Sequence, residues 1–203
     1  KNLSIFDITV IQYCPNLIKL SLTRTEQIND IAAISSATKL TELRLDWNRI
    51  SDLGPISNLI NLEYLSISGN QIKNINAISN LTNLKELELG HNQISDIIAL
   101  SNLTQLRKLN LDNNKVGNIA VLSEMDFLAE LTLSSNQIAD VSVLLENKGI
   151  PGEITLNDNP LSNTSVFTHL PILRSQGKKV KFDELPDDVI KMNDFAFEAS
   201  LRK

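Results

Sequence analysis

The sequence predicts an α/β repeat solenoid with a concave parallel β-sheet, a convex side of 3₁₀ or short helical turns, and a capped C-terminus. Three observations predict it. One phrase returns about every 22 residues, apolar positions within the phrase change their spacing from two to three, and the last phrase is followed by an irregular apolar segment. A unit this short cannot bury its own apolar side, so successive units must stack into one elongated core.

The repeated phrase is L-x-x-L-x-L-x-x-N followed by I-x-x-I or a close variant. Its clearest copy has Leu84, Leu87, Leu89, Asn92 and Ile94. The L-x-L part alternates apolar and polar residues, as a strand with one buried face does. The isoleucine part has a spacing of three, which indicates a tight 3₁₀-like turn. Because these turns are bulkier than strands, the stack is expected to curve with its sheet inside.

The first units are less regular than those that follow. Residues 1–14 match the back half of a repeat, so we expect a partial repeat there and a solenoid of about seven repeats over residues 15–159. The unit that begins at Leu17 carries one extra residue near Thr25, and the last unit carries one around residues 151–152. Cys14 occupies a leucine position of the repeat and is expected to be buried.

Two polar ladders run through the repeats. An inward carboxamide at the strand exit can donate to and accept from backbone groups of neighbouring coils. We therefore interpret as structural the ladder Asn48, Asn70, Asn92, Asn114, Asn136 and Asn159. Asp and Asn before a turn accept local backbone N–H groups. This role is predicted for Asp30, Asp52, Asn74, Asp96, Asn118 and Asp140, although a metal-binding stack is an alternative.

Residues 160–182 are expected to cap the solenoid. Pro160 stops the turn, and Val166, Phe167, Leu170 and Leu173 have helical spacing. Gly177 can end that helix, and residues 179–182 then alternate as a strand. Such a cap would cover the last coil and its sheet edge. Residues 183–203 combine an acidic stretch with an amphipathic piece, which we interpret as a linker and short helix that could begin a further module.

The repeat resembles the internalin-like leucine-rich repeats of bacterial surface proteins over about residues 3–182, most clearly over 81–97. The phrase over 156–162 is similar to the last repeat of such proteins, and 194–202 is similar to the helix that opens such modules. The resemblance implies an extracellular or surface-displayed adhesion module that binds a protein, such as a host receptor. The period also fits intracellular 22-residue repeat proteins.

Composition excludes several classes of function. The net charge of -5 and the lack of a basic stripe argue against nucleic acid. No apolar run approaches the roughly 20 residues of a membrane span. His91 and His169 lie far apart in the sequence with no nucleophile placed beside them, so we expect no enzyme. Cofactors and a metal site are not expected, because the carboxylates lack a loop with ligand spacing. We expect a monomer.

The candidate binding residues are those that alternation places on the concave face or at the strand exit. They include the only tryptophan of the chain and a tyrosine one repeat later, which are residue types that often anchor interfaces. The predicted binding residues are Arg44, Trp47, Tyr64, Glu86, Glu88, His91, Lys108, Asp112 and Glu130. An acidic group within this set, comprising Glu86, Glu88, Asp112 and Glu130, could attract a basic partner or simply be solvated.

The leading hypothesis is a non-catalytic module that binds a protein partner on the concave sheet, with a glycan as a further possible ligand. Two alternatives stay open on the sequence: a structural spacer on the cell envelope, and an intracellular leucine-rich repeat scaffold. An incidental exposed aromatic at Trp47 is likewise compatible with the pattern.

Overall fold

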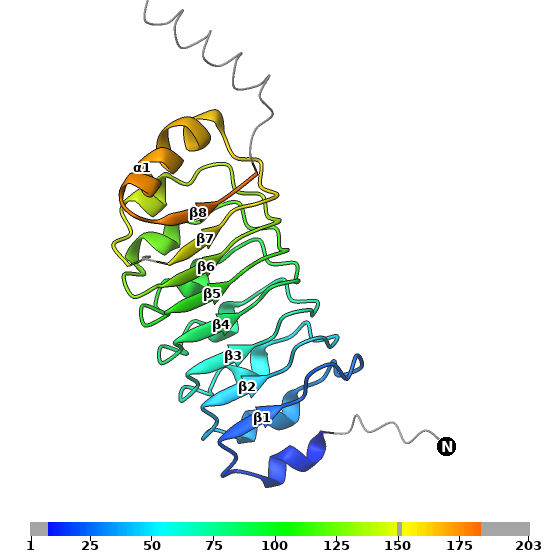
Figure 1. Cartoon of the computed structure of the whole chain (residues 1–203). Coiled ribbons are helices and arrows are strands. Elements are labelled where there is room, and N and C mark those ends of the chain that lie inside the picture. The colour runs from blue at the N-terminus through cyan, green and yellow to red at the C-terminus, as the bar shows by residue number, and fades with distance from the viewer. Residues whose placement is uncertain (1–7, 150–151, 184–203) are drawn as a thin grey trace, which may run out of the picture.

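The computed structural model describes residues 8–149 and 152–183. In this part of the chain eight parallel strands form one open sheet in sequence order, and the coils stack into a curved solenoid (Figure 1). The strands are β1 (Lys19–Ser21), β2 (Glu42–Arg44), β3 (Tyr64–Ser66), β4 (Glu86–Glu88), β5 (Lys108–Asn110), β6 (Glu130–Thr132), β7 (Glu153–Thr155) and β8 (Lys179–Lys181).

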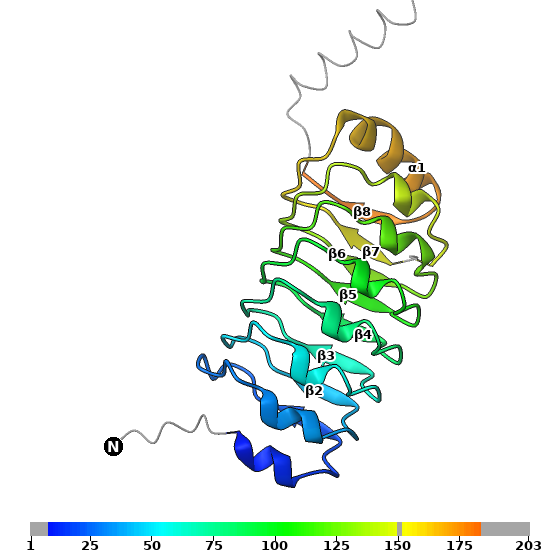
Figure 2. The ribbon, with the colours of Figure 1, turned by 180° about the vertical axis from the view of Figure 1, so that it is seen from behind.

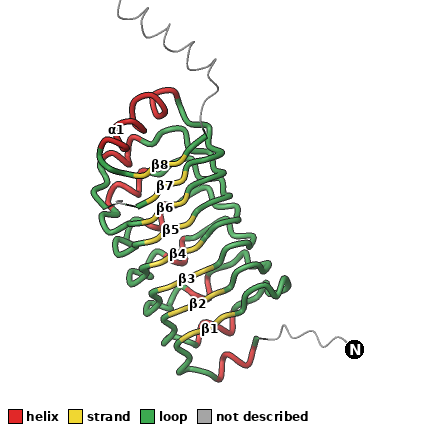
Figure 3. Tube along the Cα trace, viewed as in Figure 1, coloured by secondary structure: helices red, strands yellow, loops and turns green. Residues whose placement is uncertain are grey.

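The side opposite the sheet consists of short turns, as the threefold apolar spacing predicts (Figure 2). Each coil alternates strand, loop and turn, which Figure 3 separates by colour. The 3₁₀ turns are η1 (Thr9–Tyr13), η2 (Ala32–Ser36), η3 (Gly54–Ile56), η4 (Asn76–Ile78), η5 (Ile98–Leu100), η6 (Ala120–Glu124) and η7 (Ser142–Leu145). Both the fold class and the position of the turns are thus confirmed.

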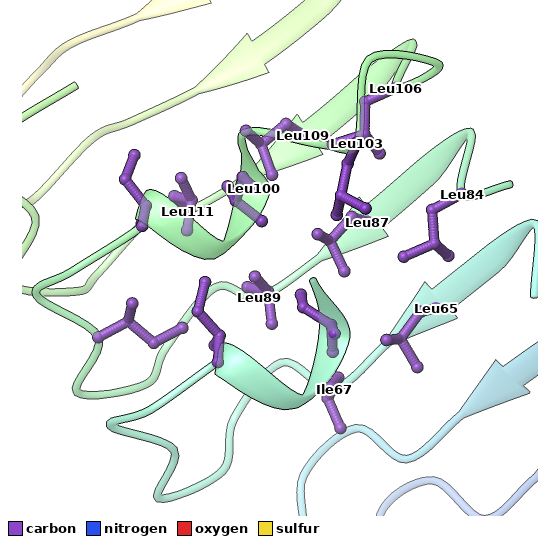
Figure 4. Packing of buried hydrophobic residues seen from close by; sticks show 14 of the residues in the cluster. Leu65, Ile67, Leu84, Leu87, Leu89, Leu100, Leu103, Leu106, Leu109 and Leu111 are labelled. Atoms are coloured by element: carbon purple, nitrogen blue, oxygen red, sulfur yellow. The ribbon is translucent and has the colours of Figure 1, made fainter. Parts of the chain in front are cut away.

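The constant repeat length puts like residues in register. Leu43 pairs with Leu65, and Leu65 pairs with Leu87 in the next strand. These leucines, together with Leu84 and Leu89, have no exposed surface and belong to one aliphatic core. Figure 4 shows Leu65, Leu84, Leu87 and Leu89 within it. Complete burial of one such side chain contributes about 1.5–3 kcal/mol to folding. The register therefore follows from packing as well as from strand pairing.

The asparagine ladder at the strand exits is structural, as Asn92 illustrates. Its Nδ2 donates to the carbonyls of Ile67, Leu89 and Gly90, and its Oδ1 accepts the N–H of Ile72 at 3.1 Å. One carboxamide thus satisfies backbone groups of two adjacent coils. The second ladder is also confirmed: the N–H two residues further on donates to the Oδ1 of Asp30, Asp52, Asn74, Asp96, Asn118 and Asp140.

The extra residue predicted near Thr25 is Glu26. Thr25 takes the ladder position of its repeat, and its hydroxyl donates to the Oδ1 of Asn48. Arg49 N–H donates to the Ile28 carbonyl, as Gln71 N–H does to the Ile50 carbonyl, so the surplus residue lies between Thr25 and Ile28. Glu26 adopts a left-handed φ of 58°, which lets the loop bulge outward without breaking the next coil.

The cap consists of a π-helical turn η8 (Ser165–His169) that continues into α1 (Leu170–Ser175), followed by β8. Leu170 and Leu173 are fully buried, and Gly177 follows the helix with a φ of +83°. Lys178 is buried, and its Nζ donates to the carbonyls of Leu144 and Asn147 near the end of η7. The cap is therefore fixed to the last coils by apolar packing and by this ammonium.

One burial prediction is wrong. Cys14 is exposed, although Ala37 and Leu59 at the same repeat position are fully buried, because none of the described segments packs on the N-terminal side of the first coil. In the cap, Phe167 is 40% exposed, whereas Ser165 of the same π-helical turn is buried. Residues 1–7, 150–151 and 184–203 lie outside the described residues. The domain boundaries that rest on them, and the short helix over 194–202, stay predictions.

A candidate protein-binding face

An arginine and a tyrosine form the best-defined feature of the concave sheet. Arg44 on β2 and Tyr64 on β3 project on the same face, and the guanidinium carbon of Arg44 lies 4.2 Å from the centre of the Tyr64 ring. A guanidinium at this position is attracted to the ring face. Tyr64 is thereby held half-buried and in a fixed orientation.

Glu42 holds the same arginine from the other side. Lys19 Nζ and Arg44 Nε each lie 2.8 Å from a different carboxylate oxygen of Glu42. The hydrogen bond from Lys19, followed by that from Arg44, lowers the pKa of Glu42, and the bond with Glu42 raises the pKa of Arg44. The guanidinium is thus positioned by a carboxylate on its own strand and by an aromatic ring on the next.

Trp47 lies where β2 leaves the sheet. Its backbone is left-handed, with a φ of 57°, as are the residues at the corresponding position of the other coils: Arg24, Gly69, His91, Asn113, Ser135 and Asp158. The indole lies over Gly69, reaches His91 two repeats away with 5.3 Å between ring centres, and stays 45% exposed. A large, partly exposed ring therefore stands at the exit of the strand that carries Arg44.

The predicted acidic group is not an uncompensated cluster. Lys108 on β5 lies 3.1 Å from Glu88 and 3.8 Å from Glu130, and the hydrogen bond with Glu88 raises the pKa of the lysine. Glu86 is exposed on the same face. The described concave surface near β4–β6 consequently carries one lysine among four carboxylates and stays net acidic.

Asp112 has a structural contact that the sequence did not reveal. Its Oδ1 accepts the N–H of Ser134 at 2.6 Å, and burial raises the pKa of this carboxyl. Asp46 makes the equivalent contact with the N–H of Ser68 at 2.9 Å and also accepts the hydroxyl of Ser66. The period-two alternation of the strand predicts that the Ser66 side chain is exposed, but in the structure it is buried. Of the predicted binding residues, Asp112 is therefore already engaged within the fold.

Sequence reasoning missed a hollow beside Trp47, on the edge formed by the strand-exit loops. Its volume is about 570 Å³, and its walls are Arg24, Glu26, Trp47, Asn48, Arg49, Gly69 and Gln71. The sequence signals for it were the extra residue near Thr25 and the tryptophan and glycine at positions 47 and 69 of successive strand exits. We call this the exit hollow.

Neither a metal site nor a membrane span is present in the described part of the chain. Over residues 8–149 and 152–183, no three His, Cys, Asp or Glu side chains are grouped to hold a metal ion. None of the helices in those residues combines the length and apolar character needed to cross a bilayer.

Comparisons with known proteins agree with this geometry. Two family descriptions match: "Leucine rich repeat" over residues 38–94 and "Leucine Rich repeats (2 copies)" over residues 82–124. The sequence has no significant match among curated proteins.

Several solved structures share the fold. An internalin of Listeria monocytogenes, InlF, is 25% identical, with a TM-score of 0.71 over 86% of this chain and 59% of that protein. Internalin C2 of the same species is 28% identical, with a TM-score of 0.61 over 85% and 74%. A leucine-rich repeat protein of Leptospira interrogans, 24% identical, has a TM-score of 0.67 over 87% and 51%, which shows the fold alone.

The chain therefore spans 59% of the InlF structure and 51% of the Leptospira structure. Leucine-rich repeat domains typically bind proteins, and most are non-catalytic. The repeat phrase, the asparagine ladder, the strand register and these neighbours together show a leucine-rich repeat solenoid that is similar to bacterial internalins.

Proposed function

We propose that this chain is a non-catalytic recognition module, secreted or displayed on a bacterial surface, that binds a host or other extracellular protein on its concave sheet. The observation that supports this most directly is the group of Arg44, Tyr64 and Trp47. It comprises a guanidinium 4.2 Å from an aromatic ring and, three residues after that arginine, a 45% exposed indole, and none of these side chains is required by the aliphatic core.

The physical basis is pre-organisation. Arginine, tyrosine and tryptophan dominate the energetics of interfaces when they sit in defined pockets. Here Glu42 fixes Arg44, Arg44 covers Tyr64, and Gly69 supports Trp47. A partner would find these groups already oriented on rigid strands, so binding costs little conformational entropy. Two of the neighbouring structures are internalins, which favours an extracellular setting.

The test is binding of the purified chain to a panel of host extracellular proteins, compared with the double variant Trp47→Ala/Tyr64→Ala. Removing two interface anchors should weaken the complex more than about tenfold, while the thermal midpoint changes little. The matched control is Tyr13→Ala/Phe127→Ala, which removes two exposed aromatics that lie outside the strands.

Unaltered affinity in the concave-face variant, or an equal loss in the control, contradicts the concave assignment. A folded chain that binds nothing in the panel contradicts the recognition function itself.

A further inference from the structure

The exit hollow has no counterpart in an ideal repeat, because three departures from the repeat meet there. Glu26 is the extra residue of its coil, Trp47 replaces a small or polar residue, and Gly69 removes a side chain one coil further on. A Cβ on Gly69 would lie 2.5 Å from Cε3 of the indole, so Trp47 can form this wall only because position 69 is glycine. The hollow is thus formed by the non-repeating residues, where function is expected to lie.

The walls of the hollow are basic in a protein that is acidic as a whole. Arg24 and Arg49 both line it and are exposed, and neither makes an ion pair within the described residues. Glu26 is the one acidic residue of the lining, against a net charge of -5 for the chain. Arg44, by contrast, pairs with Glu42, and Arg174 lies over Phe182.

The other residues that line the hollow offer a ligand both polar and apolar surface. The amide of Asn48 is engaged in the ladder, where its Nδ2 donates to the Leu22, Leu45 and Asp46 carbonyls. Gln71 is exposed on the rim, and the indole supplies the apolar surface. A ligand for this site therefore needs an anionic group for the guanidiniums and an apolar group for the indole.

We propose that the exit hollow binds an acidic segment of the protein partner, with an Asp or Glu carboxylate held by Arg24 and Arg49 and a neighbouring apolar side chain packed on Trp47. This inference rests on the proposed function and adds the chemistry of the partner. Guanidiniums bind carboxylates through short, charge-assisted and often bidentate hydrogen bonds.

A peptide fits better than a sugar on two grounds. Trp47 lines the hollow and lies three residues after Arg44 in the same coil, so one extended polypeptide can contact both the hollow and the Arg44–Tyr64 pair. Two arginines without ion-pair partners favour a full negative charge over neutral hydroxyl groups. An acidic sugar provides the same charge, and the experiment separates the two.

Trp47 is the only tryptophan in the chain, so its fluorescence reports directly on the hollow. The probe is the acidic peptide acetyl-Leu-Glu-Asp-Leu-amide, titrated at low salt against its neutral counterpart acetyl-Leu-Gln-Asn-Leu-amide. Glucuronic acid and N-acetylneuraminic acid test the sugar reading. The variants are Arg24→Gln and Arg49→Gln, with Arg107→Gln as a control on an exposed arginine outside the hollow.

The acidic peptide should change the Trp47 emission in a saturable way that salt weakens, and each hollow variant should lower its affinity about fivefold or more. The neutral peptide should leave the Trp47 emission unchanged. The Arg107→Gln variant should bind the acidic peptide with the affinity of the wild type. No response to the acidic peptide, an equal response to the neutral one, or tighter binding of either sugar overturns the proposal.

Binding of a panel protein separates this inference from the proposed function. If Trp47→Ala/Tyr64→Ala abolishes that binding while Arg24→Gln/Arg49→Gln leaves it unchanged, the concave module stands and the acidic-segment inference is wrong. A comparable loss in both double variants supports both proposals.

Discussion

The indole of Trp47 rests on the backbone of Gly69: a Cβ added to the glycine would come within 2.5 Å of the ring atom Cε3. Gly69 stands in the row of left-handed residues at the strand exits, with a φ of 69°. Its missing side chain lets the indole cross one whole coil and approach His91 on the next, with 5.3 Å between ring centres. The exposure of Trp47 toward a ligand therefore depends on a residue in another repeat.

Gly69→Ala should destabilise the chain and displace the indole. The left-handed backbone costs an alanine about 1 kcal/mol, and the contact with Trp47 adds to that cost. The thermal midpoint should fall and the Trp47 emission should shift. In a Trp47→Ala background the alanine at position 69 no longer meets an indole. The fall in thermal midpoint caused by Gly69→Ala should therefore be smaller there than in the wild type. Equal effects in both backgrounds would show that the two residues are not coupled.

Asn92→Ala should lower the free energy of unfolding by about 3 kcal/mol or more, because it leaves several buried backbone groups without a partner. The carboxamide donates to three carbonyls and accepts the Ile72 N–H. The control is Asn102→Ala, an exposed asparagine on the outer side, for which a change within about 0.5 kcal/mol is expected. Urea unfolding measures both. Similar losses in the two variants would argue against the structural role of the ladder.

Asp112→Asn should stabilise the fold at neutral pH and not at acid pH. Burial raises the pKa of this carboxyl, so the folded state holds the proton more tightly than the unfolded state does. Stability from this group is consequently greatest below the unfolded pKa of about 3.9 and decreases as the pH rises through the folded pKa. Asparagine keeps an oxygen for the Ser134 N–H without the ionisation penalty.

The measurement is urea unfolding of the wild type and of Asp112→Asn at a series of pH values from below about 3.9 up to neutral pH. The gain of the variant should grow with pH and disappear below about pH 3.9. A gain that does not vary with pH, or one that grows toward acid, would show that ionisation of Asp112 is not responsible.

The regular part of the fold could be predicted because it depends only on periodicity. A constant repeat length brings Leu43, Leu65 and Leu87 into one column and each ladder asparagine beside the next coil. Once a unit must bury its leucines against a copy of itself, strand order, register and both polar ladders follow. The extra residue near Thr25 was also visible, since it shifts the phase of the repeat.

The solenoid, its concave sheet and its outer turns thus follow from the repeat alone, as do most of the residues that face outward. The tertiary structure alone decided which of those residues meet. Alternation did not distinguish Asp112, which is engaged with Ser134, from Glu86, which is exposed. Nor did it show that Gly69 would bring Trp47 to His91, or that Arg24 and Arg49 would line one hollow. The physical reason is that periodicity fixes the backbone, whereas contacts between coils depend on the size and shape of each non-repeating side chain.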